Sequence, residues 1–422
     1  MFNLSVYSGS RICVALSGGK DSMALVNFIY THMRECGITL TALNCDHKMR
    51  GEASARDSAF VEQWCGQRKI PLLKFVWDYE GAKTEQTARA WRRECYKTAL
   101  ESGADFVATA HHMNDNAETV LFNLARGSAI AGLAGICDGE RIIHPLISCT
   151  REEIDTYVSE NNVPFVEDET NLSNDYTRNK IRHNILPELE KAVPGAVGNI
   201  YRLSRLADED ERYFSSVIEE RGILKITPFG AAISLAESVI FKRAAVKAVK
   251  YFGRKDYTAE HLQNLYLLAQ SGKNKKFEFL GLTAYGGDSK IVITECVENK
   301  AEIPLSSYRG KEFCGQRLII SNRTQGEGKI LKLDLGAIPE GAIIRFKRDG
   351  DKFTKFGGGT KSLGDFFTDK KIPVWVRTKI PIIVRGDEVL AVCGVEISDS
   401  IKVTENTKDV AYISAYDYTA ET

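Results

Sequence analysis

The chain has 422 residues, 43% of them hydrophobic, and its 56 basic side chains are balanced by 56 acidic ones. Such a length supports a full hydrophobic core and suggests roughly two to four domains, while the balanced charge requires any nucleic-acid surface to be local. No apolar run approaches the roughly 18 residues of a membrane helix, and the ten cysteines contain no C-x-x-C pair. We therefore expect a cytoplasmic protein without membrane contact, with reduced thiols rather than a zinc site.

Apolar runs and amphipathic segments alternate over the first 165 or so residues, which is typical of an α/β fold with a parallel sheet. The predicted strands are 12–16, 38–45, 72–76, 106–110 and 142–146. The predicted helices are 22–33, 54–68, 84–102, 114–124 and 151–161. Ligands of such sheets bind beyond the carboxyl ends of the strands, so the residues that follow each strand are the candidates for function.

The first predicted strand ends in the turn Ser-Gly-Gly-Lys-Asp-Ser, residues 17–22. Two glycines let the backbone approach an anion, and the following helix offers unpaired N–H groups and a partial positive charge. A plain tight turn is the alternative, and a Walker loop is excluded because Asp21 stands where Ser or Thr is required. The turn resembles the PP-loop of ATP pyrophosphatases, which cleave ATP between the α and β phosphates. The expected ATP-binding residues of this turn are Ser17, Gly18, Gly19, Lys20, Asp21 and Ser22.

Charged loops follow two further strands. Asp46 to Glu52 reads D-H-K-M-R-G-E, which is either a solvated loop or part of the site. After the fourth strand come two histidines and the acids of H-H-x-x-D-x-x-E-T, of which Asp115, Glu118 and Thr119 share one helix face. The acids could merely stabilise the helix dipole. Neighbouring histidines of an extended chain point oppositely, so Mg²⁺ carried by ATP fits better than a tight zinc site.

The helix 84–102 carries a basic face with Arg89, Arg92 and Tyr96 at helical spacing. This face is either simply solvated or binds phosphates. A second basic group lies near the C-terminus, where a solvated face is again the alternative. Its members are Lys370, Lys371, Arg377 and Lys379.

Together and in this order, the four N-terminal motifs resemble the tRNA(Ile)-lysidine synthetase family. The likeness continues through R-G-S and G-L-A-G at 126–135, D-E-T-N with Y-x-R-N-x-I-R at 168–182, and R-D-G-D through P at 348–381. Three residues depart from the family pattern: His144 replaces a common Arg, Arg93 a Tyr and Gly364 a Lys. Between these blocks we expect only a β-hairpin that joins 277–279 to 291–294 around Gly286-Gly287.

The resemblance implies a three-part architecture. Residues 1–205 would form a Rossmann-like, parallel-sheet PP-loop catalytic domain. Residues 206–330 would form a helical middle domain with a β-hairpin that contacts tRNA, and 331–422 a β-rich C-terminal tRNA-binding domain.

The resemblance also implies a reaction. The family joins L-lysine to C2 of the wobble cytidine of the CAU-anticodon tRNA(Ile), using ATP and Mg²⁺ and releasing AMP and pyrophosphate. The C2 oxygen is a poor leaving group until it becomes an adenylate, after which the lysine ε-amine can attack. The general base, the residues that bind lysine and reject tRNA(Met), and the oligomeric state, a homodimer included, stay open.

Residue roles follow from the same resemblance. Asp46 and Asp115 are the expected catalytic residues, with Asp115 also a metal ligand, and His111 and His112 line the nucleotide crevice. The residues expected to bind tRNA or substrate are Arg50, Arg89, Arg92, Glu118, Arg178, Asn179 and Arg182. Another PP-loop tRNA-modifying enzyme, such as a thiolase, would use the same ATP chemistry but typically needs cysteines for sulfur. A non-catalytic tRNA-binding protein would be expected to lose some of these motifs.

Overall fold

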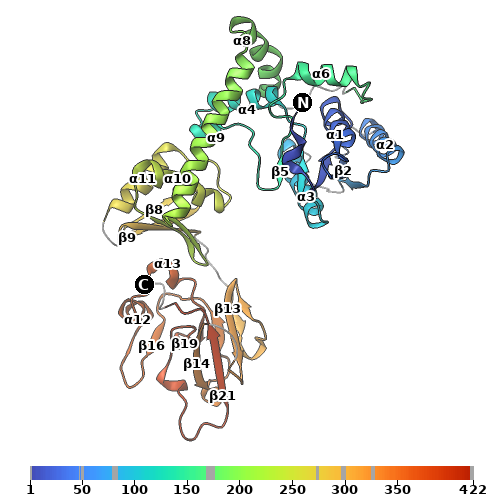
Figure 1. The fold of residues 1–422 in the computed structure, drawn as a ribbon. Coiled ribbons are helices and arrows are strands. Elements are labelled where there is room, and N and C mark those ends of the chain that lie inside the picture. Colours follow the sequence, from blue (N-terminus) through green and yellow to red (C-terminus); the bar gives the residue numbers. More distant parts are fainter. Residues whose placement is uncertain are drawn as a thin grey trace. The chain divides into compact units, whose positions relative to one another are not determined.

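Figure 1 shows the fold of the chain in a computed structural model. It describes all residues except 1, 47, 49–51, 78–83, 168–175, 272–274, 296–300, 325–327 and 419–422. The chain divides into two units, Met1–Ser215 and Ser216–Thr422. Within the described ranges, no helix is long and apolar enough to cross a membrane. The finer division after residues 205 and 330 stays a prediction.

A parallel sheet with strand order β3-β2-β1-β4-β5 forms the centre of the first unit. Its strands are β1 (Arg11–Ala15), β2 (Thr39–Asp46), β3 (Leu72–Val76), β4 (Phe106–Ala108) and β5 (Ile142–Ile143). All five predicted strands are therefore confirmed. The strand order runs outward from β1 in both directions, so β1 and β4 flank the point where the order reverses, which is where doubly wound sheets bind ligands.

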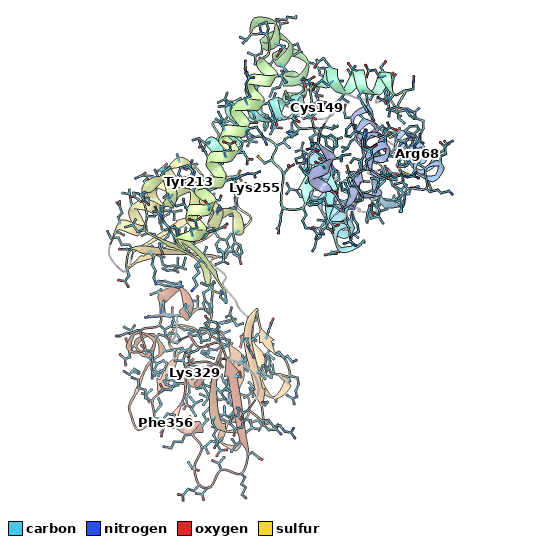
Figure 2. All side chains as sticks on the ribbon, in the orientation of Figure 1. Arg68, Cys149, Tyr213, Lys255, Lys329 and Phe356 are labelled. Atoms are coloured by element: carbon cyan, nitrogen blue, oxygen red, sulfur yellow. The ribbon has the colours of Figure 1, made fainter. Side chains whose placement is uncertain are left out.

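The five predicted helices of the first unit are confirmed as α1 (Lys20–His32), α2 (Glu52–Gln67), α3 (Glu85–Glu101), α4 (Met113–Ala125) and α6 (Arg151–Glu160). Four further helices were not predicted: α5 (Ile130–Leu133), α7 (Tyr176–Lys180), α8 (Leu186–Ala192) and α9 (Ala196–Glu220). A 3₁₀ turn η1 (Leu4–Tyr7) and a π turn η2 (Ile181–Ile185) complete the unit. Thr150 and Glu153 begin α6 through a capping box, since each side chain meets the other's backbone N–H at 3.2 and 2.7 Å. Just beyond α2, the Arg68 guanidinium lies 4.2 Å from the Trp64 ring centroid (Figure 2).

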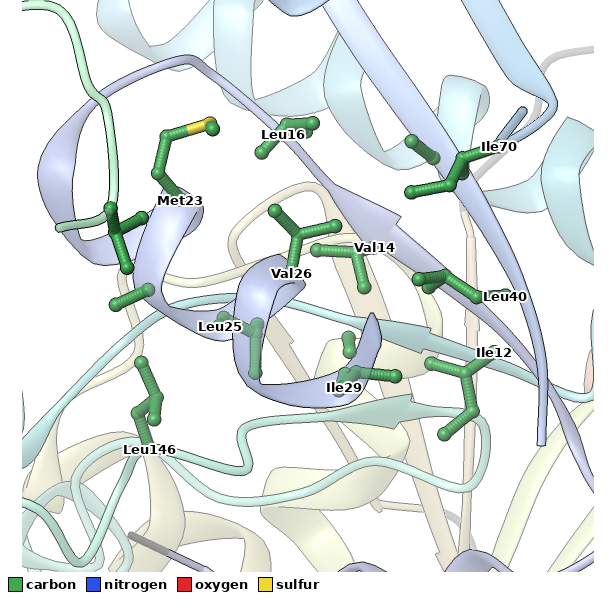
Figure 3. Close-up of a cluster of buried hydrophobic side chains, with 14 of the residues drawn as sticks. Ile12, Val14, Leu16, Met23, Leu25, Val26, Ile29, Leu40, Ile70 and Leu146 are labelled. Atoms are coloured by element: carbon green, nitrogen blue, oxygen red, sulfur yellow. The ribbon is translucent and has the colours of Figure 1, made fainter. Parts of the chain in front are cut away.

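Alternating side chains of β1 pack on both faces of the sheet. Ile12 and Val14 are fully buried against α1, whose apolar face includes Leu25 and Ile29 (Figure 3). Cys13, between them, belongs to a second cluster with residues of α3 on the opposite face. A strand that is buried on both sides reads as a continuous apolar run, and this is why its position is clear from the sequence.

The second unit begins with the end of α9 and a five-stranded antiparallel sheet of order β6-β7-β10-β9-β8. Its elements are β6 (Leu224–Thr227), β7 (Gly230–Ser234), α10 (Ser238–Tyr251), α11 (Ala259–Gln270), β8 (Lys275–Phe279), β9 (Leu282–Gly287) and β10 (Lys290–Glu295). The expected helical region is present.

The predicted hairpin in this region is wrong in its pairing. Residues 277–279 pair with β9 across a turn at Leu280-Gly281, and 291–294 pair with β9 across Asp288-Ser289. All four turn residues have positive φ. Gly286 lies inside the strand, where an added Cβ would be 2.9 Å from the Leu268 carbonyl oxygen, so it is glycine to let α11 approach and not to form a turn.

The rest of the second unit is β-rich, as expected. One sheet has the order β11-β15-β18-β19-β16-β17 with β20 paired to β19, and another has the order β12-β13-β21-β14. The strands are β11 (Ile303–Pro304), β12 (Glu312–Phe313), β13 (Gln316–Ser321), β14 (Lys329–Asp334), β15 (Ile343–Arg345), β16 (Lys352–Thr354), β17 (Thr360–Ser362), β18 (Ile382–Arg385), β19 (Glu388–Val392), β20 (Glu396–Ile397) and β21 (Val410–Ala415). The helical turns are η3 (Leu305–Ser307), η4 (Leu335–Ala337), α12 (Leu363–Asp369), α13 (Val374–Arg377) and η5 (Asp399–Ile401).

Candidate active site at the carboxyl edge of the parallel sheet

The PP-loop is a rigid turn between β1 and α1. Gly18 has a φ of +89°, which favours glycine, and its carbonyl oxygen accepts a hydrogen bond from the Val166 N–H at 2.9 Å. The buried Ser22 hydroxyl donates to the Gly19 carbonyl at 2.9 Å and accepts from the Ser17 N–H at 3.2 Å. The loop is thus shaped by its own hydrogen bonds. The N-terminus of α1 follows it directly and offers an anion-binding site.

Asn44 supports the base of this loop and was not predicted from the sequence. Its buried side chain donates to the Leu16 carbonyl at 2.9 Å and accepts from the Ser58 hydroxyl at 2.9 Å. An amide in the middle of the apolar run of β2 is the signal that could have revealed it, because a buried polar group needs partners.

The first turn of α1 carries two charged side chains. Lys20 forms an ion pair with Asp155 of α6. Asp21 has one carboxyl oxygen buried without a hydrogen-bond partner, and its other oxygen lies 3.7 Å from Nε2 of His112. Burial, together with the negative charge of Asp115, raises the pKa of Asp21 against the opposing effect of His112. Among the described residues, none donates a hydrogen bond to the buried oxygen of Asp21.

Asp115 lies beside Asp21, at the start of α4. Its Oδ2 accepts the His112 backbone N–H at 3.1 Å and lies 3.4 Å from Nε2 of the same ring. Its Oδ1 lies 2.9 Å from the guanidinium of Arg182. His112 therefore stands between the two carboxylates that flank the PP-loop.

Arg182 also binds Glu118, the next acid on the same face of α4. Two guanidinium nitrogens of Arg182 donate to the Glu118 carboxylate at 2.6 and 2.9 Å. Burial raises the pKa of Glu118, and Arg182 opposes that rise. Burial also disfavours the charge of Arg182, but the hydrogen bond and charge of Glu118 raise the pKa of Arg182 overall. A fork-shaped pair of this kind is the strong form of ion pair.

Arg178 contacts the same helix face, where its guanidinium donates to the Thr119 hydroxyl at 3.1 Å. Asp115, Glu118 and Thr119 therefore share one face of α4, as their spacing predicted. This face is covered by arginines from α7 and η2.

The two histidines point in opposite directions, as expected for neighbouring residues of extended chain. His112 is buried beside the carboxylates. His111 instead shares a hydroxyl, that of Thr109, with the buried His144 ring.

The other predicted site residues lie on β2, α3 and α7 or outside the described residues. Asp46 ends β2, and its carboxylate accepts the Lys48 N–H at 2.9 Å, with no contact to Asp115 among the described residues. On α3, Arg89 is exposed and Arg92 is half-buried. Asn179 of α7 is half-buried, and Arg50 and 168–175 lie outside the described residues.

The carboxylates fit a divalent cation that arrives with phosphates. In the part of the chain that the structure describes, no three His, Cys, Asp or Glu side chains are placed to hold a metal. Asp21 with its orphaned oxygen and Asp115 offer two carboxylates, and Mg²⁺ commonly takes one or two carboxylates together with substrate phosphates.

Most of the basic residues singled out near the C-terminus have partners within the second unit. Lys370 pairs with Glu396, and the Arg377 guanidinium donates to the Ile372 carbonyl at 2.8 Å. The Lys379 ammonium donates to the Phe229 carbonyl at 2.7 Å and to Thr294. These three side chains therefore make contacts that stabilise the fold of the second unit.

Comparisons with known proteins agree with this geometry. Residues 2–189 match the model of the PP-loop domain, and 342–414 match that of the TilS substrate C-terminal domain. The tRNA(Ile)-lysidine synthase of Bacteroides thetaiotaomicron is 30% identical over 95% of this chain and 94% of its own length. That of Geobacter sulfurreducens is 28% identical over 96% and 93%. A U34-tRNA thiolase structure from Methanococcus maripaludis is 20% identical with a TM-score of 0.42, and covers 49% of this chain and 74% of that one. The chain belongs to the tRNA(Ile)-lysidine synthase family.

Proposed function

We propose that this chain is a C–N ligase that joins L-lysine to C2 of the wobble cytidine of CAU-anticodon tRNA(Ile). ATP supplies the activation, and the products are lysidine, AMP and pyrophosphate. The main supporting observation is the PP-loop at the switch point of the sheet, where the loop's own Asp21 and Asp115 of α4 lie on either side of His112. The lysidine synthase relatives match this chain over nearly its whole length.

In the first step, the C2 oxygen of cytosine bonds to the α-phosphorus of ATP while the bond to pyrophosphate breaks. The N–H groups of the PP-loop and the Lys20 ammonium stabilise the negative charge that develops on the phosphates. Asp155 holds Lys20 at the loop. Mg²⁺, when bound with ATP, neutralises phosphate charge, and Asp21 and Asp115 are the residues that would hold it.

In the second step, the lysine ε-amine attacks C2 and AMP departs with the former C2 oxygen. The amine has a reference pKa of about 10.4 and must lose a proton to react, so a proton acceptor is required, for which we propose a carboxylate. Asp46 and Asp115 stay the two candidates, because Asp46 ends β2 and Asp115 follows β4, and both strands neighbour β1 at the same sheet edge.

The two candidates can be separated by the step that fails. A residue that acts only as the base for lysine attack is not needed for the first step, so its loss leaves pyrophosphate release intact. A residue that positions ATP is needed for the first step, so its loss prevents pyrophosphate release. We expect Asp115→Asn to abolish pyrophosphate release and Asp46→Asn to permit one turnover of it without AMP release. If Asp46→Asn releases AMP and incorporates lysine normally, Asp46 is not the base.

The tRNA is bound by basic and polar side chains near the crevice, which we assign to Arg89, Arg92, Arg178, Asn179 and Arg182, and by the C-terminal domain. An enzyme that modifies one base recognises the rest of the RNA through shape and backbone contacts. The cytidine must leave its stack to reach the PP-loop. We place the reaction in the cytoplasm.

The test is incorporation of labelled L-lysine into a CAU-anticodon tRNA(Ile) transcript. We expect one lysine per tRNA with stoichiometric AMP, and none with a transcript whose wobble C is changed to U. The matched protein control is Asp115→Ala, which should be folded by circular dichroism and inactive. ADP as the product, sulfur incorporation in place of lysine, or full activity of Asp115→Ala would contradict the proposal.

A further inference from the structure

The helix α10 of the second unit carries a basic face to which the proposed function assigns no role (Figure 1). Residues 238–255 hold six basic side chains and no acidic one, although the charges of the whole chain balance. The six are Lys242, Arg243, Lys247, Lys250, Arg254 and Lys255. Because Arg243, Lys247 and Lys250 are spaced by four and three residues, they share one face of the helix.

The opposite face of α10 is packed into the core of the second unit. Its buried residues are Ile240, Phe241, Ala244, Ala245, Ala248 and Val249. On the basic face, Lys250 is exposed, and Arg243 and Lys247 are half-buried, as long charged side chains often are when their stems lie along a helix. An interfacial helix must insert its apolar face into a lipid surface. The apolar face of α10 is already occupied, so the basic face alone is available to a partner.

The acidic residues next to α10 do not neutralise this face. Glu237, which precedes the helix, pairs with Arg221 at 3.0 Å. Among the described residues, neither Lys247 nor Lys250 forms an ion pair. The basic face therefore keeps its positive charge available for an anion.

Two ordinary explanations account for only part of this face. Cations in the last turn of a helix interact favourably with its dipole, which explains Lys250 but not Lys247, one turn earlier. A solvated helix face usually mixes charges of both signs. Here Arg243 and Lys247 instead place like charges four residues apart, which is unfavourable for an isolated helix and is offset when an anion binds.

The sheet of the same region has no such bias. Residues 275–295, which form β8, β9 and β10, contain three basic and three acidic side chains. One of the basic ones, Lys276, donates to Glu278 at 2.6 Å. A polyanion is therefore attracted more strongly to α10 than to the strands on which the tRNA contact of this region was expected.

We propose that the face of α10 formed by Arg243, Lys247 and Lys250 binds phosphates of an RNA backbone and does not read bases. Lysine ammonium groups on flexible stems act as point charges that suit phosphates of any sequence. The identification of the RNA as the substrate tRNA rests on the proposed function, whereas the preference for a polyanion does not.

The test is the salt dependence of tRNA binding to the full chain, measured by filter binding of a CAU-anticodon tRNA(Ile) transcript. We expect the double variant Lys247→Gln/Lys250→Gln to reduce the slope of log K against log salt by about 2, since each phosphate contact releases roughly one counterion. The matched control is Lys275→Gln/Lys290→Gln, which removes two charges from the neighbouring sheet and should keep the wild-type slope.

Two further measurements separate a backbone contact from other causes. Lys247→Arg/Lys250→Arg should keep the slope, because a phosphate contact needs the charge and not the ammonium group. A transcript whose wobble C is changed to U should show the same reduction in the glutamine variant, because the face does not read bases. Lys250→Gln alone, at the exposed position, should reduce the slope by about 1 and decides the test if the double variant unfolds.

The possible outcomes distinguish this proposal from the proposed function. A wild-type slope in Lys247→Gln/Lys250→Gln, or equal reductions in this variant and its control, would overturn the role of α10 even if the wild-type chain incorporates lysine. Binding to phosphatidylserine vesicles that is lost in the glutamine variant, with tRNA binding unchanged, would overturn it in favour of a lipid surface. A reduced slope in a chain whose wild type binds tRNA but incorporates no lysine contradicts the proposed function alone.

Discussion

At the scale of single residues, Arg182 competes with any bound cation for the carboxylate oxygens of Asp115 and Glu118 on α4. Its guanidinium occupies one oxygen of Asp115 and both of Glu118. Neither acid is therefore freely available, and a ligand cation at Asp115 must either use its other oxygen or displace Arg182. The same pairing gives Arg182 a structural role in addition to the tRNA contact proposed above, because the Glu118 side chain is only 4% exposed.

Replacing Arg182 should destabilise the first unit. In Arg182→Ala the buried Glu118 carboxylate loses its partner, and we expect the free energy of unfolding to fall by about 2–3 kcal/mol. Urea unfolding followed by tryptophan fluorescence measures it, since Trp64, Trp77 and Trp91 lie in this unit. Adding Glu118→Gln to Arg182→Ala should recover part of the loss, because an amide carries no charge. A double variant less stable than Arg182→Ala would contradict this account.

The sequence placed three of the predicted site residues on one helix face but did not show how they pair. The spacing of Asp115, Glu118 and Thr119 placed them on one face, because helix periodicity is a local property. The partnership of Glu118 with Arg182 joins residues 64 positions apart and depends on packing. His144 read as a departure from the family pattern, and only the fold shows that it meets Thr109.

At the scale of elements, prediction succeeded where one signal dominated. The central strand β1 is a continuous apolar run, and the helices between the strands are long and amphipathic. The strand pairing of the middle region was harder to predict, because a glycine can mark either a turn or a place where another element packs closely. Gly286 admits a helix, while non-glycine residues at Leu280, Asp288 and Ser289 take the positive φ of the turns.

The glycines of the PP-loop should differ in the same way. Gly18 has a φ of +89°, whereas Gly19 has a φ of −70° and is the N-cap of α1. We expect Gly18→Ala to lower the free energy of unfolding by about 1–2 kcal/mol. Gly19→Ala should cost about 0.5 kcal/mol, through the weaker N-cap preference of alanine. Tryptophan-monitored urea unfolding compares them, and equal losses would show that φ is not what selects glycine at position 18.

At the scale of the whole molecule, the described cysteines of both units differ in how far their thiols are buried. All nine are free thiols, of which Cys314 is exposed and Cys393 is fully buried. Burial raises the pKa of Cys393 to about 12. Reaction with thiol reagents needs both access and thiolate, so these two positions should behave at opposite extremes.

Thiol labelling should therefore be ordered by burial. With a maleimide at pH 7.5, we expect Cys314 to react first among the described cysteines and Cys393 to react only after denaturation. Peptide mass mapping measures each rate, and Cys314→Ser should remove the fast phase attributed to this residue. Labelling of Cys393 in the folded chain at a rate similar to that of Cys314 would contradict the burial described above.

The balanced charge of the chain makes tRNA binding depend on where its arginines lie. Arg89 is exposed near the start of α3, so it lies toward the carboxyl edge of the sheet, where the site is. Arg68 follows the end of α2, at the opposite edge, with its guanidinium over Trp64 (Figure 2). These two residues form a matched pair, because each can lose one charge without touching the PP-loop.

We expect Arg89→Gln to weaken tRNA binding and to reduce the slope of log K against log salt by about 1, since each phosphate contact releases roughly one counterion. Arg68→Gln should leave the slope unchanged. The slopes of the two variants and the wild type are compared by filter binding of a CAU-anticodon tRNA at salt concentrations from about 50 to about 200 mM. If both variants keep the wild-type slope, the α3 face does not contact the RNA backbone. If both reduce it equally, the contact depends on total charge rather than on position.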